Sequence, residues 1–228
     1  MIPLRDTIRA RRFPIVTVSI IVVNLAIFLF SITLSPGELQ RFVTAFGIVP
    51  ALQVQMFLQA PLALDTWIPM ATSMFLHGGW LHVLGNMLYL WVFGDNIEDV
   101  LGRGRFLLFY LLAGFAGGLA HIVSAPGSLI PTIGASGAVA GVLGAYFITF
   151  PGSRILALVP ILFFITFVEV PAVLFLFLWI GFQLLYGLLA ITGPANMVAW
   201  WAHVGGFAAG MLLMKIIPAA NRFHRRTR

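Results

Sequence analysis

The sequence predicts an all-α polytopic membrane protein: a bundle of six transmembrane helices with a long interfacial first outer loop. Of its 228 residues, 61% are hydrophobic and only 9% are charged, and the mean hydropathy is +1.03. A soluble domain is about 45–50% apolar and about 25% charged, so a chain of this length cannot bury such an excess. Two further observations support this fold class: apolar segments of spanning length, and a one-sided distribution of Lys and Arg.

A transmembrane helix needs about 20 mostly apolar residues, because the hydrocarbon layer is about 30 Å thick and a helix rises about 1.5 Å per residue. Five segments meet this requirement, and a sixth is shorter but continuous. The six predicted spans are 13–34, 80–97, 106–123, 134–150, 172–191 and 198–217. The segment 155–168 is also apolar, but it is short and contains Pro160. Counting it as a span would give seven.

The distribution of basic residues decides between six spans and seven. With six spans and both termini inside, all of the 13 Lys and Arg residues except Arg41 lie on the cytoplasmic side, as the positive-inside rule requires. A seventh span would move the basic C-terminal segment outside. We therefore interpret 155–168 as an interfacial or partly re-entrant connection. The N-terminal apolar run is too long for a cleavable signal, so we expect it to be retained.

The first outer loop, 35–67, is the one long connection. It has few charges among many apolar residues, and Pro36, Pro50 and Pro61 interrupt it, so we expect it to lie in the membrane interface.

No repeat or composition change divides the chain, and 1–228 is predicted to be a single domain. The absence of cysteine excludes disulfides and thiolate catalysis. The basic residues lie at the ends and in short loops rather than along one face, which argues against nucleic-acid binding.

Polar side chains inside the predicted spans are candidates for function, because they are expensive to place in lipid. They gather in the outer half of the bundle, and they are His82, Asn86, His121, Ser136 and His203. Ser136 falls in the first turn of its helix. His203 lies about 8 Å from the start of its own predicted span, 198–217. The two therefore lie at similar depths. Small residues on both helices permit close packing.

A serine and a histidine at one depth suit nucleophilic catalysis, in which the histidine takes the hydroxyl proton. His82 and Asn86 share one helical face and can donate hydrogen bonds to an oxyanion. The unpaired first-turn amides of Ser136 and Gly137 are further donors. The outer loop offers only Glu38 and Asp65 as acids, and neither is placed to orient the histidine. The predicted machinery is therefore a Ser-His dyad.

Each of these residues also has a plainer interpretation. A lone serine in a Gly-rich helix usually packs or bonds to its own helix, and a lone buried histidine usually makes an interhelical hydrogen bond, the role that we give to His121.

A transporter is a second possible function for the protein as a whole, besides an enzyme. A conducting path, however, needs polar groups at every depth, and the inner halves of the spans are apolar. A third is a non-catalytic protein that binds membrane helices and needs no nucleophile.

Three motifs of the chain resemble those of the rhomboid intramembrane serine proteases. They are His77-Gly78-Gly79-Trp80-Leu81-His82-Val83-Leu84-Gly85-Asn86, Gly134-Ala135-Ser136-Gly137 and Ala202-His203-Val204-Gly205-Gly206. The resemblance covers nearly the whole chain and implies Ser136 as nucleophile, His203 as base, and His82 with Asn86 as oxyanion donors. It also implies that Glu98 is a structural anchor. Ala140 departs from the pattern, because some members place an aromatic residue there that stacks on the histidine.

The resemblance implies an intramembrane serine endopeptidase that cleaves transmembrane segments of single-pass membrane proteins through an acyl-enzyme, with no metal and no cofactor. The substrate must unwind locally, because the hydrogen bonds of an intact helix shield its peptide bonds. We expect substrates to enter from the lipid bilayer past the fifth span, with Trp179 in the gate. We also expect the protein to lie in the plasma (inner) membrane of a prokaryote, with both termini cytoplasmic.

Overall fold

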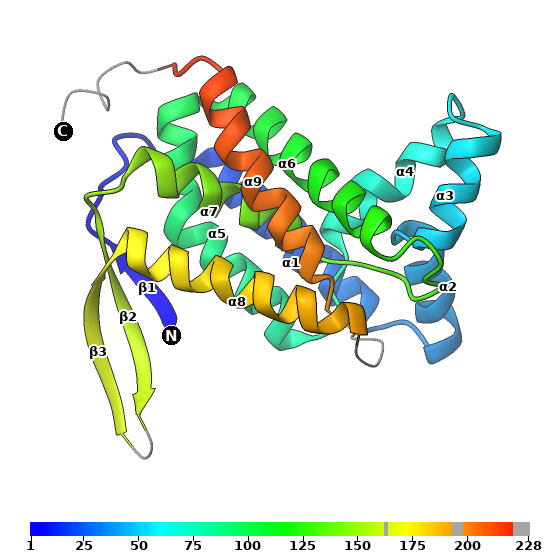
Figure 1. Cartoon of the computed structure of the whole chain (residues 1–228), viewed down its shortest axis with the longest axis horizontal. Helices are drawn as coiled ribbons and strands as arrows, with labels where there is room; N and C mark the ends of the chain where they lie inside the picture. Colours follow the sequence, from blue (N-terminus) through cyan, green and yellow to red (C-terminus); the bar gives the residue numbers. More distant parts are fainter. Residues whose placement is uncertain (162–163, 193–197, 221–228) are drawn as a thin grey trace.

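The computed structural model describes residues 1–161, 164–192 and 198–220, and the chain is mostly helical, at 69%. The helices are α1 (Ile15–Ser31), α2 (Pro36–Phe46), α3 (Pro50–Gln59), α4 (Leu64–Thr72), α5 (Trp80–Leu101), α6 (Arg103–Ser124), α7 (Ser136–Thr149), α8 (Ala172–Thr192) and α9 (Trp200–Ile216). A short 3-10 helix, η1 (Ser73–Phe75), precedes α5. The strands are β1 (Ile2–Asp6), β2 (Arg154–Ile161) and β3 (Phe164–Pro171). Figure 1 shows α6, α7 and α9 side by side in the middle of the molecule.

A helix occupies each of the six segments that were predicted to span the membrane. Within the described residues, α6 and the stretch 172–190 of α8 are long and apolar enough to cross a membrane by length and composition. Helices α1 and α7 are apolar but shorter, at 17 and 14 residues. The crossing of the membrane by all six helices, and their grouping into one domain, stay predictions.

The all-α fold class was wrong at one end of the bundle. The segment 155–168 lies in the antiparallel hairpin of β2 and β3, and β1 pairs with β2 to complete a three-stranded sheet. The hairpin is rich in Ile, Val and Phe, which favour strands. Periodicity alone cannot separate a short apolar strand from a buried helical segment. This is why the sequence excluded a seventh span there without identifying the strands.

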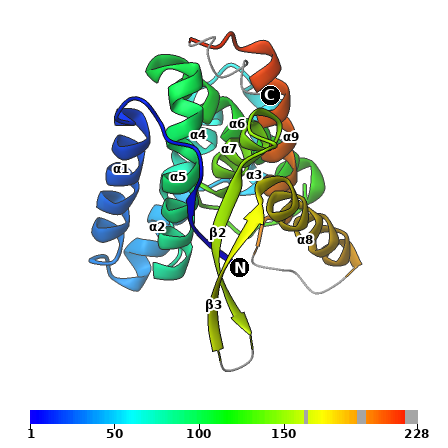
Figure 2. The same cartoon turned by 90° about the vertical axis from the view of Figure 1, so that its left-hand side faces the viewer.

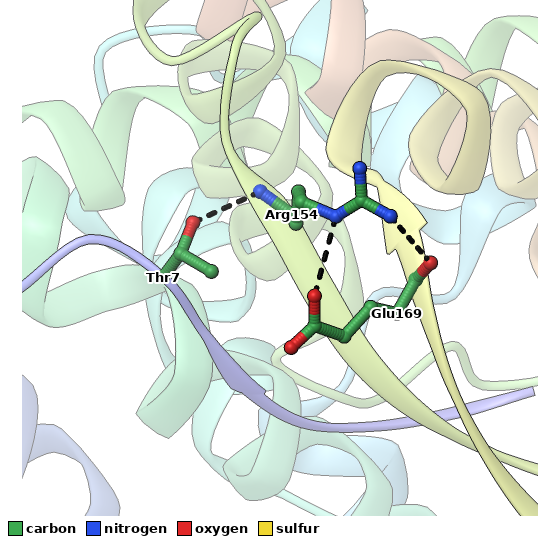
Figure 3. Close-up of polar contacts among 3 residues, drawn as sticks. All are labelled: Thr7, Arg154 and Glu169. Atoms are coloured by element: carbon green, nitrogen blue, oxygen red, sulfur yellow. Dashed lines mark hydrogen bonds and ion pairs between the residues drawn. The ribbon is translucent and has the colours of Figure 1, made fainter.

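Polar contacts connect β2 with β3 and with Thr7, the residue that follows β1. The guanidinium Nε of Arg154 lies 3.3 Å from the Glu169 carboxylate across the two strands, as Figure 3 shows. The backbone N–H of Arg154 donates to Thr7 Oγ1 at 3.0 Å. Both charged side chains are half exposed, and an ion pair of this kind contributes about 0–1 kcal/mol. The backbone ladder therefore holds the sheet together, and the ion pair adds little.

The first outer loop consists largely of three helices, α2, α3 and α4. Pro36 and Pro50 stand at the first positions of α2 and α3, where the missing N–H of proline costs nothing. The Ser35 N–H donates to the Glu38 carboxylate at 2.9 Å in a capping box at the start of α2. Two of the three prolines that interrupt the loop in sequence thus mark helix starts, and the third, Pro61, lies in the turn between α3 and α4. Figure 1 shows these helices at the end of the molecule opposite the sheet.

Glu98 ties the start of α1 to the end of α5. Its buried carboxylate accepts hydrogen bonds from the backbone N–H groups of Val16, at 3.0 Å, and Thr17, at 2.8 Å, and from the Thr17 hydroxyl at 2.8 Å. These amides are unpaired at a helix start, where the helix dipole also favours a negative charge. The residue before the helix, Pro14, provides no side-chain cap. The structure therefore shows Glu98 in the anchoring role that the resemblance implied.

The sheet and the end of α9 both lie near the end of α5. The Ala220 N–H donates to the Val100 carbonyl oxygen at 2.9 Å, which joins the chain after α9 to the end of α5. Asp6 of β1 accepts hydrogen bonds from Asn96 Nδ2, at 3.0 Å, and from the Tyr146 hydroxyl, and burial raises the pKa of Asp6 to about 6. Four residues of the predicted basic C-terminal segment lie outside the described residues: Arg222, Arg225, Arg226 and Arg228.

Candidate active site

Helices α7 and α9 pack with their backbones in direct contact. A Cβ on Gly206 would lie 2.0 Å from the carbonyl oxygen of Gly137, and a Cβ on Gly210 would lie 1.9 Å from that of Gly141. No side chain fits at Gly206 or Gly210 while the helices stay at this distance. The close packing that the small residues predicted is confirmed. It places Ser136 and His203, which adjoin this contact on the two helices, on the same side of the bundle.

Ser136 is the first residue of α7, so its own N–H and that of Gly137 belong to the unpaired first turn. The helix has 14 residues, about 21 Å in length. Its neighbours α5 and α6 have 22 residues each. Residues 137–146 are all buried, and Ser136 is partly exposed at the start of this buried helix. The nucleophile candidate is thus set among longer helices and remains accessible.

Hydrogen bonds to η1 and to His77 hold the chain that leads into Ser136. The Gly134 N–H donates to the Ser73 carbonyl oxygen at 2.9 Å, and the Ala135 N–H donates to His77 Nε2 at 3.4 Å. Gly134 has a φ of +129°, which favours glycine. A Cβ there would also lie 2.6 Å from His82 Nε2 and 3.7 Å from Ser136 Oγ. The glycine therefore lets the imidazole of His82 come close to the nucleophile candidate.

Asn86 is held by His77, whose role the sequence left unassigned. Asn86 Nδ2 lies 3.1 Å from His77 Nε2. Burial, and after it the nearby charge of His82, lowers the pKa of His77 to about 3, so this imidazole is neutral. The Asn86 amide and the Ala135 N–H both face Nε2, so Nε2 is the ring nitrogen that accepts hydrogen bonds. The His77 and His82 rings meet edge to face, with their centroids 5.0 Å apart. His77 therefore connects the Asn86 amide to the segment that precedes Ser136.

His203 lies in the first turn of α9, and its Nδ1 is 2.7 Å from Oε1 of Gln183 on α8. An amide oxygen can only accept a hydrogen bond, so Nδ1 carries the proton and Nε2 is the nitrogen left to act as a base. Gln183 is not among the residues that were predicted from the sequence. Its signal was a polar side chain inside a predicted span, the same signal that singled out the histidines.

Two tryptophans flank the His203 ring. The Trp179 ring of α8 lies 6.0 Å away between centroids, and the Trp200 ring of α9 lies 6.1 Å away at an interplanar angle of 89°. Ala140, where some family members have an aromatic residue, is fully buried in α7. Aromatic rings from α8 and α9 therefore stand beside the histidine in this chain.

All four residues with predicted catalytic roles lie near helix starts at one end of the bundle: Ser136 on α7, His203 on α9, and His82 and Asn86 on α5. In the part of the chain that the structure describes, no hydrogen bond joins Ser136 to His203. Catalytic hydrogen bonds are often long until a substrate binds. His121 lies in the last turn of α6, and its structural role stays a prediction.

The fold and this site define a helical membrane protein with a cluster of polar residues at one end of an apolar bundle. The sequence model of the Rhomboid domain matches residues 64–219, which include all four of these residues. The chain belongs to the rhomboid family, and it is therefore an integral membrane protein.

The curated relatives include proteins named as proteases. The rhomboid protease GluP of Bacillus subtilis (strain 168) is 44% identical over 84 residues, which cover 37% of this chain and 16% of the relative. The mitochondrial presenilin-associated rhomboid-like protein of Homo sapiens is 30% identical over 176 residues, 72% of this chain and 42% of the relative. The corresponding protein A of Danio rerio is 35% identical over 122 residues, 51% of this chain and 32% of the relative. The chain thus spans less than half the length of each of these relatives.

Proposed function

We propose that this protein is an intramembrane serine endopeptidase that cleaves transmembrane segments of single-pass membrane proteins. The observation that carries the proposal is the backbone contact between α7 and α9, which brings Ser136 and His203 to one side of the bundle. The bond from His203 Nδ1 to Gln183 leaves Nε2 as the base. Membership of the rhomboid family and the relatives named as rhomboid proteases support the same activity.

In the proposed reaction, Ser136 Oγ attacks the carbonyl carbon of the scissile peptide bond while His203 Nε2 takes the hydroxyl proton. The C–N bond then breaks as His203 passes this proton to the leaving amine, and an ester remains on Ser136. Water gives a proton to His203 and attacks the ester carbonyl. The proton returns to Ser136 Oγ, and the carboxylate product leaves. His203 accepts and returns every proton that is transferred, so the proposed reaction needs no cofactor.

The tetrahedral intermediates carry a negative charge on the former carbonyl oxygen, which needs preorganised donors. The N–H groups of Ser136 and Gly137 lie at the positive end of the α7 dipole and are not used within the helix. We assign His82, which lies beside Gly134, and Asn86 as the side-chain donors. The Asn86 amide has two N–H groups. One of them meets His77, which leaves the other for the oxyanion.

The substrate class follows from the position of the site in an apolar bundle. Most large side chains of α8 are exposed, including Phe177 and Phe182, as expected for a helix at the edge of the bundle facing lipid, and Figure 2 shows α8 on the side of the bundle away from α1. We propose that substrate helices reach the site past α8, beside Trp179. The placement in a prokaryotic plasma membrane with both termini cytoplasmic belongs to the same proposal.

A serine-directed fluorophosphonate probe tests the proposal on the purified chain. We expect the probe to modify Ser136, as located by mass spectrometry, and we expect the chain in proteoliposomes to cleave a transmembrane reporter. Ser136→Ala should lose both the labelling and the cleavage while its thermal unfolding is unchanged. Ser124→Ala is the matched control, because this serine lies at the same end of the bundle and its hydroxyl donates to its own helix, at the His121 carbonyl oxygen. Undiminished cleavage by Ser136→Ala would refute the assignment. A wild-type chain that neither labels nor cleaves would favour the non-catalytic helix-binding alternative.

The oxyanion donors should matter less than the dyad. We expect Asn86→Ala and His82→Ala each to lower kcat about 10²–10³-fold, the usual cost of losing one such donor, because the backbone amides remain. His121→Ala, at the same end but outside the proposed machinery, should stay within about tenfold of wild type. Initial rates of reporter cleavage measure all three variants. If Asn86→Ala were as inactive as Ser136→Ala, the division of roles would be wrong.

A further inference from the structure

The hydrogen bond between Gln183 and His203 joins α8 to α9, and Gln183 itself takes no part in the proposed proton transfers. Gln183 is 9% exposed on a helix whose other large side chains are mostly exposed and apolar. Burying an amide costs free energy unless the amide is hydrogen-bonded. Its Oε1 meets that requirement through the Nδ1 of His203, 2.7 Å away. The amide therefore depends on the imidazole, and the imidazole is fixed by the amide.

We infer that Gln183 is the positioning residue of His203, a neutral amide in the place that an acid occupies in a Ser-His-Asp triad. This inference rests on the proposed function. By accepting the Nδ1 proton, Oε1 selects the tautomer in which Nε2 is the base, and it fixes the rotation of the ring. A neutral amide can accept this hydrogen bond inside an apolar bundle without any charge partner, whereas a carboxylate there stays ionised only when it is paired with a cation such as the protonated imidazole. Amides already serve this role in Cys-His-Asn proteases.

The neighbours of the imidazole reinforce this position. Trp179 and Gln183 are four residues apart on α8, so they share one helical face, and both contact His203. Trp200, three residues before His203 in the first turn of α9, meets the ring edge to face. The orientation of the base therefore depends on α8 remaining against α9. Since substrates are proposed to pass α8, the docking of this helix links substrate access to the alignment of the base.

The test compares Gln183→Leu, Gln183→Glu and wild type in the full chain, with the pH profile of kcat and the KM for a transmembrane reporter. Gln183→Leu keeps the volume and removes the acceptor, so we expect kcat to fall about 10–100-fold with KM nearly unchanged. This is smaller than the about 10⁴-fold loss for an ionised triad acid. Gln183→Glu restores an acceptor and should recover most of the rate. Its carboxylate favours the protonated imidazole, so the acidic limb of the profile should move to higher pH. Leu184→Ala, at an exposed neighbouring position, is the control and should change neither quantity.

The outcomes separate this inference from the proposed function. An inactive wild-type chain overturns both. An active wild-type chain whose rate and pH profile are unchanged in Gln183→Leu overturns the inference alone. Equal losses in the Leu and Glu variants with no shift of the acidic limb would show that Gln183 only supports packing, and they also overturn it. Should Gln183→Leu not fold, as judged by thermal unfolding, the acidic limb of Gln183→Glu decides the question by itself.

Discussion

Replacing His203 with alanine is expected to reduce reporter cleavage about 10⁴–10⁶-fold, as much as replacing Ser136. The serine hydroxyl is a weak nucleophile until a base removes its proton, so neither member of the dyad is useful without the other. Residues that act as one unit are strongly non-additive. The double variant of Ser136→Ala and His203→Ala should therefore be no less active than either single variant. Single-turnover cleavage in proteoliposomes measures all three.

The control for this series is Val204→Ala, which shortens the side chain next to His203 on α9 and removes no polar group. It should keep activity within about tenfold of wild type, and the thermal unfolding temperature should show that each variant is folded. Losses that multiplied in the double variant would mean that Ser136 and His203 act independently. That result would contradict the dyad even if both single variants were inactive.

The sequence predicted the helices well where apolar length was the deciding property, and less well where polar partners extend a helix. The predicted span 80–97 ends where the apolar run ends, but α5 continues to Leu101. Its last turn contains Glu98, whose carboxylate is buried because it accepts hydrogen bonds from the start of α1. No rule based on hydropathy can anticipate such a partner, since the two segments lie about 80 positions apart, as Glu98 and Thr17 do.

The candidate site shows the same limit. The sequence was enough to choose four candidates, because each is a polar residue in the outer part of an apolar helix. They are Ser136, His203, His82 and Asn86. Gln183 carries the same signal, but its pairing with His203 could not be predicted, because the pairing depends on how α8 is rotated against α9. Glu38 is one of the two acids in the outer loop, but its carboxylate caps α2 through Ser35. The structure instead presents an amide, Gln183, to the imidazole.

The contact between α7 and α9 should be the packing feature to which activity is most sensitive. Gly206→Ala places a methyl group where only 2.0 Å separates it from the backbone oxygen of Gly137. Backbone atoms cannot move aside as a flexible side chain does, so the helices must separate. Overpacking of this kind costs about 1–3 kcal/mol. A displacement of about 1 Å between reacting groups can cost about 10²-fold in rate.

We therefore expect Gly206→Ala to lower the thermal unfolding temperature and to reduce both the cleavage rate and the rate of probe labelling at Ser136 by about 10²-fold. Gly181→Ala on α8 is the matched control, because a Cβ there meets nothing within 4 Å. Alanine is favoured over glycine inside a helix by about 1 kcal/mol, so Gly181→Ala should leave the unfolding temperature unchanged or raise it. The same substitution thus has opposite expected effects at the two positions. If Gly206→Ala matched the control in stability and in both rates, the backbone contact would not be what aligns Ser136 with His203.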